Sequence, residues 1–463
     1  MQKDRQKLAE FVKGKKVAFI GAGVSHKTLI GQFCQMGAKV TLCDQKSLEQ
    51  FGEYGQHLQQ LGVTLSLGEG YLDGLAGQDI ILRTPGFEYF TPQLLQAKAD
   101  GSLVTSEMEL FFEYCPCEIT AVTGSDGKTT TTSLIAAMFE AAGRKVHLGG
   151  NIGRALLPIL DEIDPADEAV VELSSFQLIS MRTSPRVAVV TNVTPNHLDH
   201  HKDMQEYVDA KRNILLWQDA GCRAVLGYEN DITREMARDC KGQQCWFTRL
   251  QPTENGAFLR QDGMLCMAEN GTLTPILHKD AIKLRGVHNI ENLLAAIAAV
   301  WGRVPVSAME QVGSTFTGVE HRIEPVRLLN GVQWYNDSIA SSPTRTIAGL
   351  RSFEQKIIVI AGGYDKKIPY EPLAPELLKH AKVLVLMGQT GPKIEQAVRS
   401  CPGFEESGLK ILHAKDMQQA VQLAYQTAQP GDVVSLSPAS ASFDLYPNFE
   451  MRGRHFKELV NAL

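Results

Sequence analysis

Long apolar stretches are missing from this sequence. None of its 463 residues falls in an uncharged apolar run of about 18 residues, so we expect no membrane-spanning helix. The residues before Lys16 are mostly polar and include no apolar core of the kind found in secretion signals. Positive charge is not in excess either: the formal net charge is −6, which gives no indication of nucleic-acid binding.

Cysteine is sparse and unpatterned. The nine cysteines, an odd number, are spread singly apart from Cys115 and Cys117. A zinc site of the usual kind needs a second such pair, which the sequence does not have nearby. Unpaired cysteines are typical of a reducing compartment, so we expect a cytoplasmic protein.

What the sequence does contain is the composition of a multi-domain globular protein. Hydrophobic residues make up 44% and charged residues 21%, and 463 residues exceed what one hydrophobic core usually supports. Strand-like apolar runs alternate with helical patterns along almost the whole chain, which predicts α/β domains with parallel sheets. We expect three domains, at residues 1–106, 107–318 and 319–463.

The predicted strands follow from these apolar runs. They lie at residues 16–23, 39–44 and 79–86 in the first domain, at 119–122, 169–173, 187–193 and 223–228 in the second, and at 332–335, 356–361, 382–387 and 433–437 in the third. Residues 251–283 are polar and irregular, which favours short antiparallel strands, and a helix is expected at 289–300. The sequence shows no internal repeat and no low-complexity segment.

The most informative segment joins a strand to a helix, which we expect at residues 131–142. The apolar strand leads into a turn bounded by Gly124 and Gly127, and Lys128 and Thr129 follow. Backbone N–H groups, a helix N-terminus and a lysine at one point suit a bound polyphosphate, and the Thr129 hydroxyl suits a phosphate-bridging Mg²⁺. Two residues separate the glycines instead of the usual four, so a plain strand–turn–helix with a solvated lysine is the alternative.

A second glycine turn follows the first strand. Gly21 and Gly23 precede Asp44 by the distance expected in a dinucleotide-binding unit, since Asp44 lies 21 positions after Gly23. His26 stands where the third glycine of that motif would be. We therefore predict a nucleotide-type pocket at this sheet edge rather than a complete NAD site. A glycine turn that serves packing alone is the alternative.

Candidate metal ligands follow two later strands. Glu172 lies within or just after an apolar strand, where a buried carboxylate needs a partner, and His197, Asp199 and His200 follow the next strand. Parallel α/β enzymes carry their chemistry at the carboxyl ends of strands. Each of these side chains alone is more often structural, but downstream of the lysine-containing turn they are predicted Mg²⁺ ligands.

Two further features stay ambiguous on the residues alone. Asn289 and Asn292 are three positions apart at the start of a predicted helix, so the pair either reads a purine edge or caps the helix. Lys211, beside Arg212, has the surroundings of a solvated helix lysine.

Taken together, the motifs resemble those of the Mur ligase family, the ATP-dependent amide ligases of peptidoglycan precursor synthesis. The resemblance covers the whole chain and rests on residues 123–129 (TGSDGKT), 150–153 (GNIG), 172–177 (ELSSFQ), 196–200 (NHLDH), 210–211 (AK), 286–292 (GVHNIEN), 320–322 (EHR) and 336–338 (NDS). Within the family, residues 83–86 (RTPG), 436–444 (LSPASASFD) and 448–453 (NFEMRG) are similar to the D-glutamate-adding members.

This resemblance implies three domains: an N-terminal Rossmann-like domain for the UDP-sugar, a central ATPase domain similar to the P-loop type, and a C-terminal Rossmann-like domain that brings the amino acid. It implies that ATP activates the carboxylate of UDP-N-acetylmuramoyl-L-alanine as an acyl phosphate, which the amine of D-glutamate then attacks. The product would serve cell-wall biogenesis, and with it cell shape and cell division. We expect a cytoplasmic monomer with no nucleic-acid partner.

Several alternatives to this activity stay open. The close ones are another ligase of the family with a different acceptor and a folylpolyglutamate synthase. A nicotinamide-dependent reductase built on the Gly21 turn and a non-enzymatic nucleotide-binding module belong to other classes.

The resemblance also implies roles for individual residues. Catalysis is assigned to Lys128, Glu172, His197 and Lys211. Mg²⁺ is expected at two sites, near Thr129 and Glu172 and near His197 and Lys211. Because an ammonium would repel the metal, Lys211 is expected to react with CO₂ and become N6-carboxylysine. Contacts with ATP are implied for Gly124, Ser125, Asp126, Gly127, Lys128, Thr129, Thr130, Asn289, Asn292, Arg322 and Asp337. Contacts with the UDP-sugar are implied for Ser25, His26, Asp44, Thr84, Gly86, Asn151 and His197, and contacts with D-glutamate for Ser341, Lys366, Ser442, Phe443 and Phe449.

One position in the D-glutamate site departs from the family pattern. Some members have a lysine after the Asn-Asp-Ser triplet, where this chain has Ile339. The positive charge for a dicarboxylate then comes from Lys366, with Lys367 and Arg345 as substitutes for the missing lysine.

Overall fold

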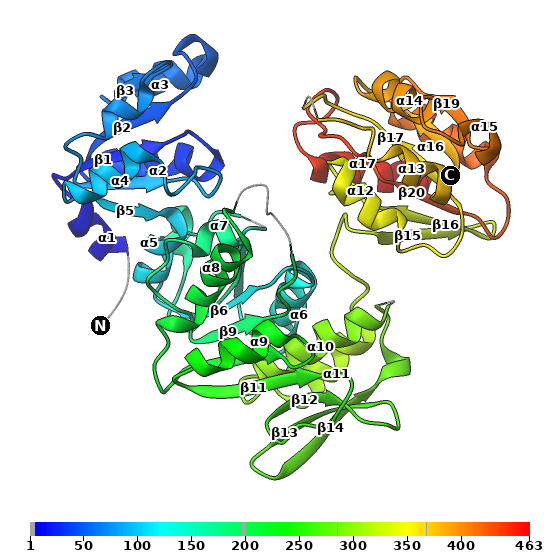
Figure 1. Cartoon of the computed structure of the whole chain (residues 1–463), viewed down its shortest axis with the longest axis horizontal. Helices are drawn as coiled ribbons and strands as arrows, with labels where there is room; N and C mark the ends of the chain where they lie inside the picture. Colours follow the sequence, from blue (N-terminus) through cyan, green and yellow to red (C-terminus); the bar gives the residue numbers. More distant parts are fainter. Residues whose placement is uncertain (1–4, 153, 196–200, 285, 367) are drawn as a thin grey trace. The chain divides into compact units, whose positions relative to one another are not determined.

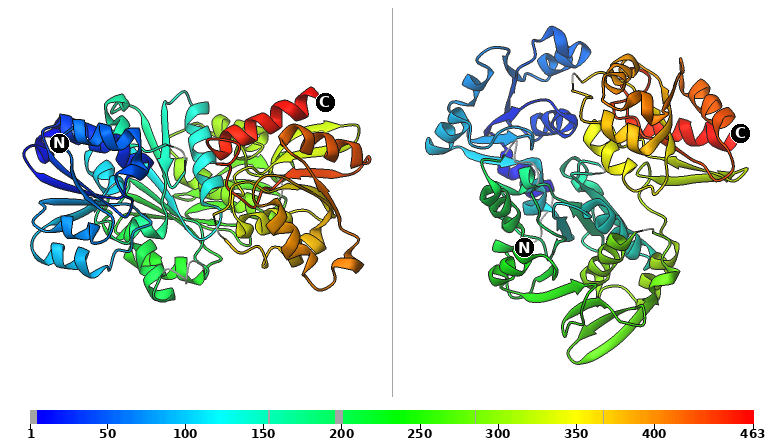
Figure 2. Two further views of the ribbon diagram at one scale, coloured as in Figure 1. Left: turned by 90° about the horizontal axis from the view of Figure 1, so that it is seen from above. Right: turned by 45° about the vertical axis from the view of Figure 1, so that its right-hand side comes forward.

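Three β-sheets with helices around them make up the chain in the computed structural model, which describes residues 5–152, 154–195, 201–284, 286–366 and 368–463 (Figures 1 and 2). The chain divides into two compact units, Met1–Phe316 with two of the sheets and Thr317–Leu463 with the third. The predicted α/β class with largely parallel sheets is confirmed. In the described part of the chain, every helix is too short or too polar to cross a bilayer.

The first sheet has five parallel strands in the order β3-β2-β1-β4-β5. The strands are β1 (Lys16–Ile20), β2 (Lys39–Asp44), β3 (Thr64–Leu67), β4 (Ile80–Arg83) and β5 (Leu103–Ser106). The helices are α1 (Arg5–Val12), α2 (Val24–Gln35), η1 (Glu49–Phe51), α3 (Glu53–Gln60), η2 (Tyr71–Leu75) and α4 (Pro92–Ala99). Strand order reverses between β1 and β4, and doubly wound sheets bind ligands at the carboxyl ends of the strands at such a point.

The second sheet has nine strands in the order β14-β13-β12-β11-β10-β9-β6-β8-β7 (Figure 1). The strands are β6 (Glu118–Thr123), β7 (Val146–Gly150), β8 (Glu168–Glu172), β9 (Val187–Val190), β10 (Arg223–Gly227), β11 (Gln243–Thr248), β12 (Gly256–Leu259), β13 (Met264–Glu269) and β14 (Thr272–His278). The first seven pair in parallel. The expected short antiparallel strands are present, because β12 pairs antiparallel with β13 and β13 with β14.

The helices of this region lie between the strands along the chain or, for the last three of them, after β14. They are α5 (Glu107–Tyr114), α6 (Lys128–Ala141), η3 (Leu157–Glu162), α7 (Ser175–Leu178), α8 (Met204–Leu216), α9 (Asp231–Met236), η4 (Ala237–Asp239), η5 (Lys279–Ala281), α10 (Val287–Val300) and α11 (Val306–Thr315). Side-chain oxygens of Ser106 and Asp203 cap α5 and α8 by accepting backbone N–H groups of the first turn.

Two apolar cores cover opposite faces of the second sheet. Ala121 and Val122 are neighbours in β6 and therefore point to opposite faces. Ala121 belongs to a buried cluster that also contains Phe19 of β1 and Phe111 of α5, so one core continues from the first sheet to the second. Val122 belongs to the other cluster, which includes buried residues of α6 and of the alanine-rich helix α10, such as Leu293.

The second unit is built on a six-stranded sheet in the order β15-β16-β20-β17-β18-β19. The strands are β15 (Glu324–Leu329), β16 (Val332–Asn336), β17 (Ile357–Ala361), β18 (Ala381–Leu386), β19 (Lys410–His413) and β20 (Val433–Leu436), and only β15 pairs antiparallel. The helices are α12 (Pro343–Leu350), α13 (Ala374–His380), α14 (Gly391–Arg399), α15 (Phe404–Ser407), α16 (Met417–Thr427) and α17 (Phe449–Ala462).

Candidate active site

The predicted phosphate loop connects β6 to α6 at the carboxyl end of a central strand. Gly124 and Gly127 have φ angles of 147° and 79°, a region that residues with a side chain rarely adopt. A Cβ atom on Gly124 would lie 1.9 Å from Oγ1 of Thr191, so the loop passes too close to its neighbour for a side chain. Helix α6 begins at Lys128, three residues earlier than predicted, which places the N–H groups of its first turn directly at the loop.

The Lys128 ammonium bends back over this loop. Its Nζ donates to the carbonyl oxygens of Gly124 and Ser125 at 3.0 and 2.8 Å. The buried hydroxyl of Ser125 lies 3.0 Å from that of Tyr207. Asp126 is exposed, and its N–H donates to Oδ1 of Asn192 at 3.0 Å. A positive charge therefore lies beside backbone donors, as anion binding requires.

A buried carboxylate lies next to the loop. Glu172, at the end of β8, is 2% exposed, and its two oxygens accept from the Thr129 hydroxyl and the Asn151 amide, each at 2.7 Å. The carboxyl ends of β6, β7 and β8 thus bring Thr129 and Glu172, which were predicted to share a magnesium site, together with Asn151, which was predicted to contact the UDP-sugar. A hydroxyl and a carboxylate are oxygen ligands of the kind that Mg²⁺ prefers, so these donors fit a magnesium ion. Thr130 is half-buried in the first turn of α6.

Lys211 is not the solvated lysine that its surroundings in the sequence allowed. It is 1% exposed, its Nζ donates to the carbonyl oxygen of Gly124 at 2.8 Å, and it lies 4.6 Å from the centre of the Tyr207 ring. Burial, together with the Lys128 ammonium, lowers the pKa of Lys211 well below its ordinary value, against the opposing effect of Glu172. The amine is therefore easier to deprotonate than that of a surface lysine.

Asn289 and Asn292, for which the sequence allowed either purine contact or helix capping, lie beside the phosphate loop. Nδ2 of Asn292 donates to Oδ1 of Asn289 at 2.9 Å, and Oδ1 of Asn292 accepts from the Thr131 hydroxyl at 3.3 Å. A Cβ atom on Gly127 would lie 2.2 Å from Oδ1 of Asn292. The two amides are thus fixed against the start of α6.

In the first sheet, Asp44 reaches the glycine turn as the motif predicts. Its Oδ2 accepts the N–H of Ala22 at 3.0 Å, and its Oδ1 accepts that of Lys46 at 2.9 Å. His26 is 1% exposed, and its Nδ1 lies 2.8 Å from the carbonyl oxygen of Gly21, so the ring fills space beneath the turn. Burial lowers the pKa of His26 to about 4, against hydrogen bonds that raise it, so the ring is neutral at physiological pH. Ser25 is half-buried at the start of α2.

Thr84 and Gly86 follow β4 at the same sheet edge. Thr84 is half-buried, with its methyl group near Gly21, and Gly86 is exposed with open space around it. The preceding residue, Arg83, is 1% exposed and donates through Nη2 to the carbonyl oxygen of Phe176 at 2.7 Å and to Oγ of Ser180 at 2.9 Å. Arg83 therefore links the first sheet to the central one next to the predicted UDP-sugar residues.

Within the second unit, the residues predicted to contact ATP lie beside each other. Asp337 is 3% exposed, and its Oδ1 accepts the N–H of Ile323 at 3.2 Å; Arg322, next to Ile323, is exposed. Burial raises the pKa of Asp337 to about 7, against that hydrogen bond and the positive charges of Arg322 and Arg345. Arg322 thus presents its charge to solvent while Asp337 stays covered.

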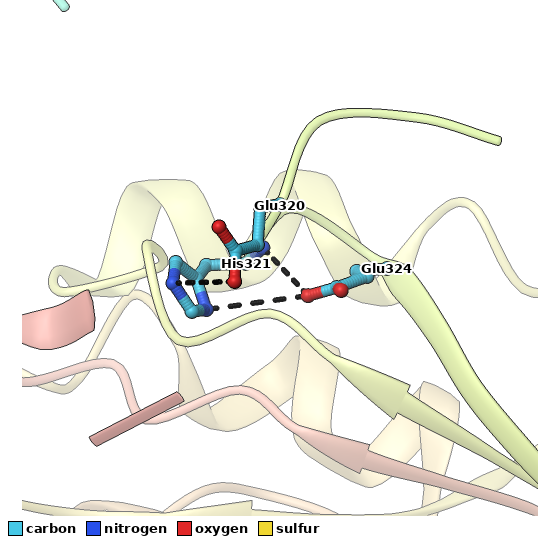
Figure 3. Close-up of side chains that lie close together, drawn as sticks. All are labelled: Glu320, His321 and Glu324. Atoms are coloured by element: carbon cyan, nitrogen blue, oxygen red, sulfur yellow. Dashed lines mark hydrogen bonds and ion pairs between the residues drawn. The ribbon is translucent and has the colours of Figure 1, made fainter. Parts of the chain in front are cut away.

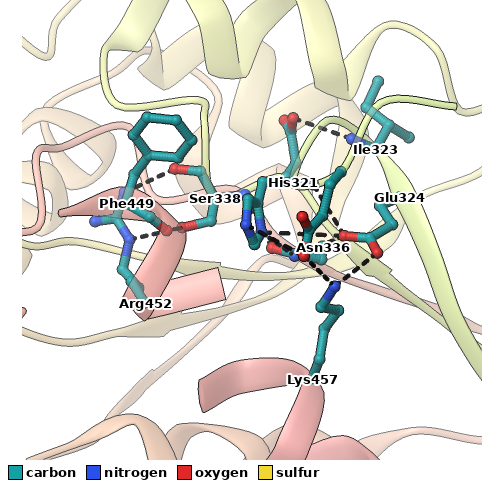
Figure 4. Close-up of polar contacts among 10 residues, drawn as sticks. His321, Ile323, Glu324, Asn336, Ser338, Phe449, Arg452 and Lys457 are labelled. Carbon is teal, nitrogen blue, oxygen red and sulfur yellow. Dashed lines mark hydrogen bonds and ion pairs between the residues drawn. The ribbon is translucent and has the colours of Figure 1, made fainter. Parts of the chain in front are cut away.

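The residues predicted to contact D-glutamate differ in exposure. Ser442 is buried, Ser341 and Phe449 are half-buried, and Lys366 and Phe443 are exposed. Arg452 of α17, which the sequence did not single out, holds this region together. Its guanidinium donates to Oγ of Ser338 and to the carbonyl oxygens of Ser440 and Ala441, each at 3.0 Å, and Figure 4 shows it beside Ser338 and Phe449.

Some predicted residues lie outside the part of the chain that the structure describes. They are His197, Asp199, His200 and Lys367. Tyr207 was missed, although its position one helical turn before Lys211 was the available signal.

Comparison with known sequences gives the family. The description "Mur ligase middle domain" matches residues 122–300, and "Mur ligase, glutamate ligase domain" matches residues 321–440. The UDP-N-acetylmuramoylalanine–D-glutamate ligase of Acetivibrio thermocellus is 54% identical over 98% of this chain and 97% of its own length. The enzyme of the same name from Clostridium novyi is 46% identical over the full length of both chains.

The chain belongs to the Mur ligase family.

Solved structures agree with this assignment at the level of the fold. The UDP-N-acetylmuramate–alanine ligase of Thermotoga maritima aligns with 97% of this chain and 99% of its own, with a TM-score of 0.52 and 17% identity. A pseudomurein peptide ligase type C from Methanothermus fervidus aligns over the same shares, with a TM-score of 0.51 and 16% identity. Membership in a family of ATP-dependent ligases decides against the nicotinamide-dependent reductase and the non-enzymatic module.

Proposed function

We propose that this protein is an ATP-dependent ligase that joins D-glutamate to UDP-N-acetylmuramoyl-L-alanine in peptidoglycan synthesis. The observation that carries the proposal is 54% identity, over 98% of the chain, to a ligase named for that acceptor amino acid. The packing of Lys128, Thr129 and Glu172 around one phosphate loop supports the ATP-dependent step.

The reaction solves a leaving-group problem. A carboxylate does not accept an amine at neutral pH because oxide is a very poor leaving group. Transfer of the γ-phosphoryl group of ATP to the alanyl carboxylate forms an acyl phosphate and ADP. The amine of D-glutamate then attacks the carbonyl carbon, the amide bond forms, and inorganic phosphate and a proton leave. Such a transfer needs positioning and charge neutralisation rather than a protein nucleophile, and Lys128 is placed to provide charge at the loop.

The residues around the loop also fit the magnesium that ATP-dependent ligases use. Thr129 and Glu172 would hold the ion, and bound Mg²⁺ supplies further neutralisation of phosphate charge. We assign Asn151 to the support of Glu172, since its amide donates to the second carboxylate oxygen.

We further propose that Lys211 is N-carboxylated in the active enzyme and belongs to a second magnesium site with His197. The neutral amine attacks CO₂, an N–C bond forms and one proton is released, which leaves a carbamate whose single negative charge is shared by two oxygens. Burial of Lys211 beside a second ammonium favours the neutral amine that this step requires.

The remaining assignments follow from the same proposal. The substrates are ATP, UDP-N-acetylmuramoyl-L-alanine and D-glutamate, and the residues named above for each are the proposed contacts. We propose that the enzyme acts as a monomer. All nine cysteines lie in the described residues and are free, which supports the reducing environment of the cytoplasm.

Release of ADP tests the proposal. The purified protein is mixed with ATP, Mg²⁺ and UDP-N-acetylmuramoyl-L-alanine, and ADP is measured after addition of D-glutamate, L-glutamate, D-glutamine, lysine or meso-diaminopimelate. We expect release with D-glutamate alone, because a site built for a dicarboxylate loses charge-assisted hydrogen bonds with D-glutamine. Equal turnover of D-glutamate and D-glutamine would refute the assigned acceptor, and so would a preference for lysine or meso-diaminopimelate.

A further inference from the structure

In the second unit, residues 320–324 form a turn that contains Arg322. Charged side chains of this turn form a cluster with Lys457 of helix α17. Nζ of Lys457, on α17, donates to a carboxylate oxygen of Glu320 at 2.7 Å and to Oε1 of Glu324 at 2.9 Å. The other oxygen of Glu324 accepts the backbone N–H of His321 at 2.9 Å (Figure 3). A single carboxylate therefore connects helix α17 to the backbone of the turn.

The same carboxylate oxygen receives a second hydrogen bond. Nδ2 of Asn336, at the end of β16, donates to it at 3.0 Å and lies 2.8 Å from Nδ1 of His321 (Figure 4). Burial lowers the pKa of His321, against the raising effect of Glu320 and Glu324, so its ring is neutral at physiological pH. Lys457 is thus the positive group that is hydrogen-bonded to both carboxylates, and Arg454 acts on Glu320 as a further charge.

The turn itself is strained. His321 and Ile323, on either side of Arg322, have φ angles of 66° and 45°, which residues with a Cβ rarely adopt. Two such residues around one exposed arginine persist only where surrounding contacts enforce them, and strain of this kind is often found at ligand-binding positions. The N–H of Ile323 is held by Asp337, and the carbonyl oxygen of His321 accepts the N–H of Ile339 at 3.1 Å.

Helix α17 also approaches the turn closely. A Cβ atom on Gly453 would lie 2.2 Å from Nδ1 of His321, so the helix backbone packs directly against the imidazole. Lys457 follows one helical turn later and extends the same contact to the two glutamates.

Glu320, His321 and Glu324 also have the appearance of a metal site, because one ligand atom from each lies within 4.8 Å of the others. The Lys457 ammonium already occupies the side of the cluster where the two carboxylates converge. A metal ion there would have to displace it, so the cluster is better explained as an internal ion pair.

We propose that Lys457, acting through Glu324, is a positioning residue that holds the Arg322 guanidinium in place for the phosphates of ATP. This inference rests on the assignment of Arg322 to ATP under the proposed function. Loss of Lys457 leaves Glu324 without its cationic partner in a partly covered site, and the strained turn then relaxes toward ordinary backbone angles.

The test compares two lysine variants of the full-length enzyme. Lys457→Met removes the charge but keeps an unbranched side chain. Lys382→Met is the matched control, since Lys382, on β18 of the same unit, forms an ion pair with Asp432. We expect Lys457→Met to raise KM for ATP and the dissociation constant of Mg·ADP, measured by calorimetry, about fivefold to tenfold. KM for D-glutamate should change less than about twofold, and Lys457→Arg should restore ATP affinity.

A second background separates positioning from a general loss of structure. In Arg322→Ala, the further change Lys457→Met should have no effect on Mg·ADP affinity, because the group that it positions is gone. If Lys457→Met weakens Mg·ADP binding in Arg322→Ala as much as in the parent enzyme, the inference is wrong. It is also wrong if Lys457→Met and Lys382→Met have equal KM values for ATP. Glu324→Gln provides a second variant if Lys457→Met folds poorly, and we expect it to weaken Mg·ADP binding to a similar degree.

Failure of the proposed function has a different signature. Mg·ADP affinity is measured without any amino acid, so it does not depend on D-glutamate being the acceptor. If Arg322→Ala alone leaves Mg·ADP affinity unchanged, the assignment of Arg322 to ATP is wrong and the inference falls with it. If Arg322→Ala weakens affinity but Lys457→Met does not, only the inference is wrong.

Discussion

Two lysines donate to the same carbonyl oxygen, that of Gly124, at 3.0 Å from Lys128 and 2.8 Å from Lys211. Two ammonium groups this close repel each other, so one of them gains by losing its proton. Lys128 is the less buried of the two and is bound to the proposed phosphate loop, whereas Lys211 is almost completely covered. The two residues are therefore expected to differ in protonation and in role.

Lys128→Ala tests the charge at the loop. A single positioned charge contributes a few kcal/mol to such a transfer, so turnover should fall on the order of 10²–10³-fold. The melting temperature should stay near that of the parent, because Lys128 is only half-buried. Lys145→Ala, which removes a lysine paired with Asp167 in the same sheet, is the control. Near-normal turnover of the Lys128 variant at saturating ATP and Mg²⁺ would exclude the role.

Carboxylation of Lys211 is tested by carbon NMR in ¹³C-bicarbonate. The parent enzyme should show a carbamate carbonyl signal that disappears in Lys211→Ala, and this variant should lose activity on the order of 100-fold when no carboxylate is added. Lys241→Ala, at an exposed lysine that donates to the carbonyl oxygen of Leu216, should keep both signal and activity. A fully active Lys211→Ala variant would end the idea.

Asp337 predicts a pH effect on stability. Its folded-state pKa of about 7 exceeds the ordinary value, mainly because of burial, so the native state holds a proton that the unfolded chain releases near pH 4. Stability therefore falls as pH rises through this window. Asp337→Asn removes the effect, and its stability relative to the parent should rise by about 2 to 3 kcal/mol between about pH 5 and pH 8 in urea unfolding. A difference that is constant with pH would contradict the prediction.

Sequence reasoning succeeded at residues whose position follows from chain order and failed where burial decides. Glu172 and Thr129 follow strands that pair in parallel, so their meeting at one sheet edge was predictable. Lys211 was interpreted as solvated from its own charge and that of Arg212, although apolar residues flank it at helical spacing on the buried face of α8: Tyr207, Val208, Ile214 and Leu215. His26 likewise lies beneath the glycine turn rather than open to solvent, a direction that the spacing does not determine.

At the scale of elements, helix α6 allows a matched pair of glycine substitutions. Gly127, before its first residue, and Gly143, just past its end, have φ angles of 79° and 77°, so alanine strains both backbones equally. Only at Gly127 would the new Cβ meet a neighbour, Oδ1 of Asn292 at 2.2 Å, while Gly143 has open space. Gly127→Ala should therefore raise KM for ATP about tenfold more than Gly143→Ala. Equal KM values for ATP in the two variants would show that the contact between position 127 and Asn292 does not affect ATP binding.

Element prediction was accurate for long apolar runs and weak elsewhere. Strand β2 has the predicted ends, and β20 ends one residue early. Six strands were missed because they are short or carry little continuous apolar pattern: β3, β5, β7, β11, β15 and β19. The early start of α6 was missed because Lys128 and Thr129 were assigned to the turn; the glycine at the helix N-cap marks the true boundary.

At the scale of the whole molecule, Arg83 connects two sheets of the first unit. Arg83→Met removes its hydrogen bonds to the Phe176 carbonyl oxygen and the Ser180 hydroxyl, and it removes the stronger of the two positive charges, Arg83 and Arg182, that act on the Glu109 carboxylate. We expect a loss of about 2 to 4 kcal/mol in unfolding free energy and a several-fold rise in KM for the UDP-linked substrate. Arg260→Met, in an exposed pair with Asp262, should change neither. A stable variant with normal KM would contradict the linking role.

Our division into three domains at 106/107 and 318/319 stays a prediction. The chain divides into two compact units after Phe316. The first two sheets, which the prediction assigned to separate domains, share one apolar core. A continuous core of this kind cannot be read from sequence, because the apolar residues of α5 look the same whether they cover one sheet or two.

The clean division at Phe316 also bears on how the chain is made. Each unit is continuous in sequence, so every residue of the first unit has left the ribosome before most of the second exists. Synthesis of the remaining residues takes roughly 7 to 30 s at bacterial elongation rates, which is ample time for the first unit to fold. The nascent chain would therefore carry a finished phosphate loop well before Arg322 and Asp337 have been placed by the packing of α17, the last helix to emerge.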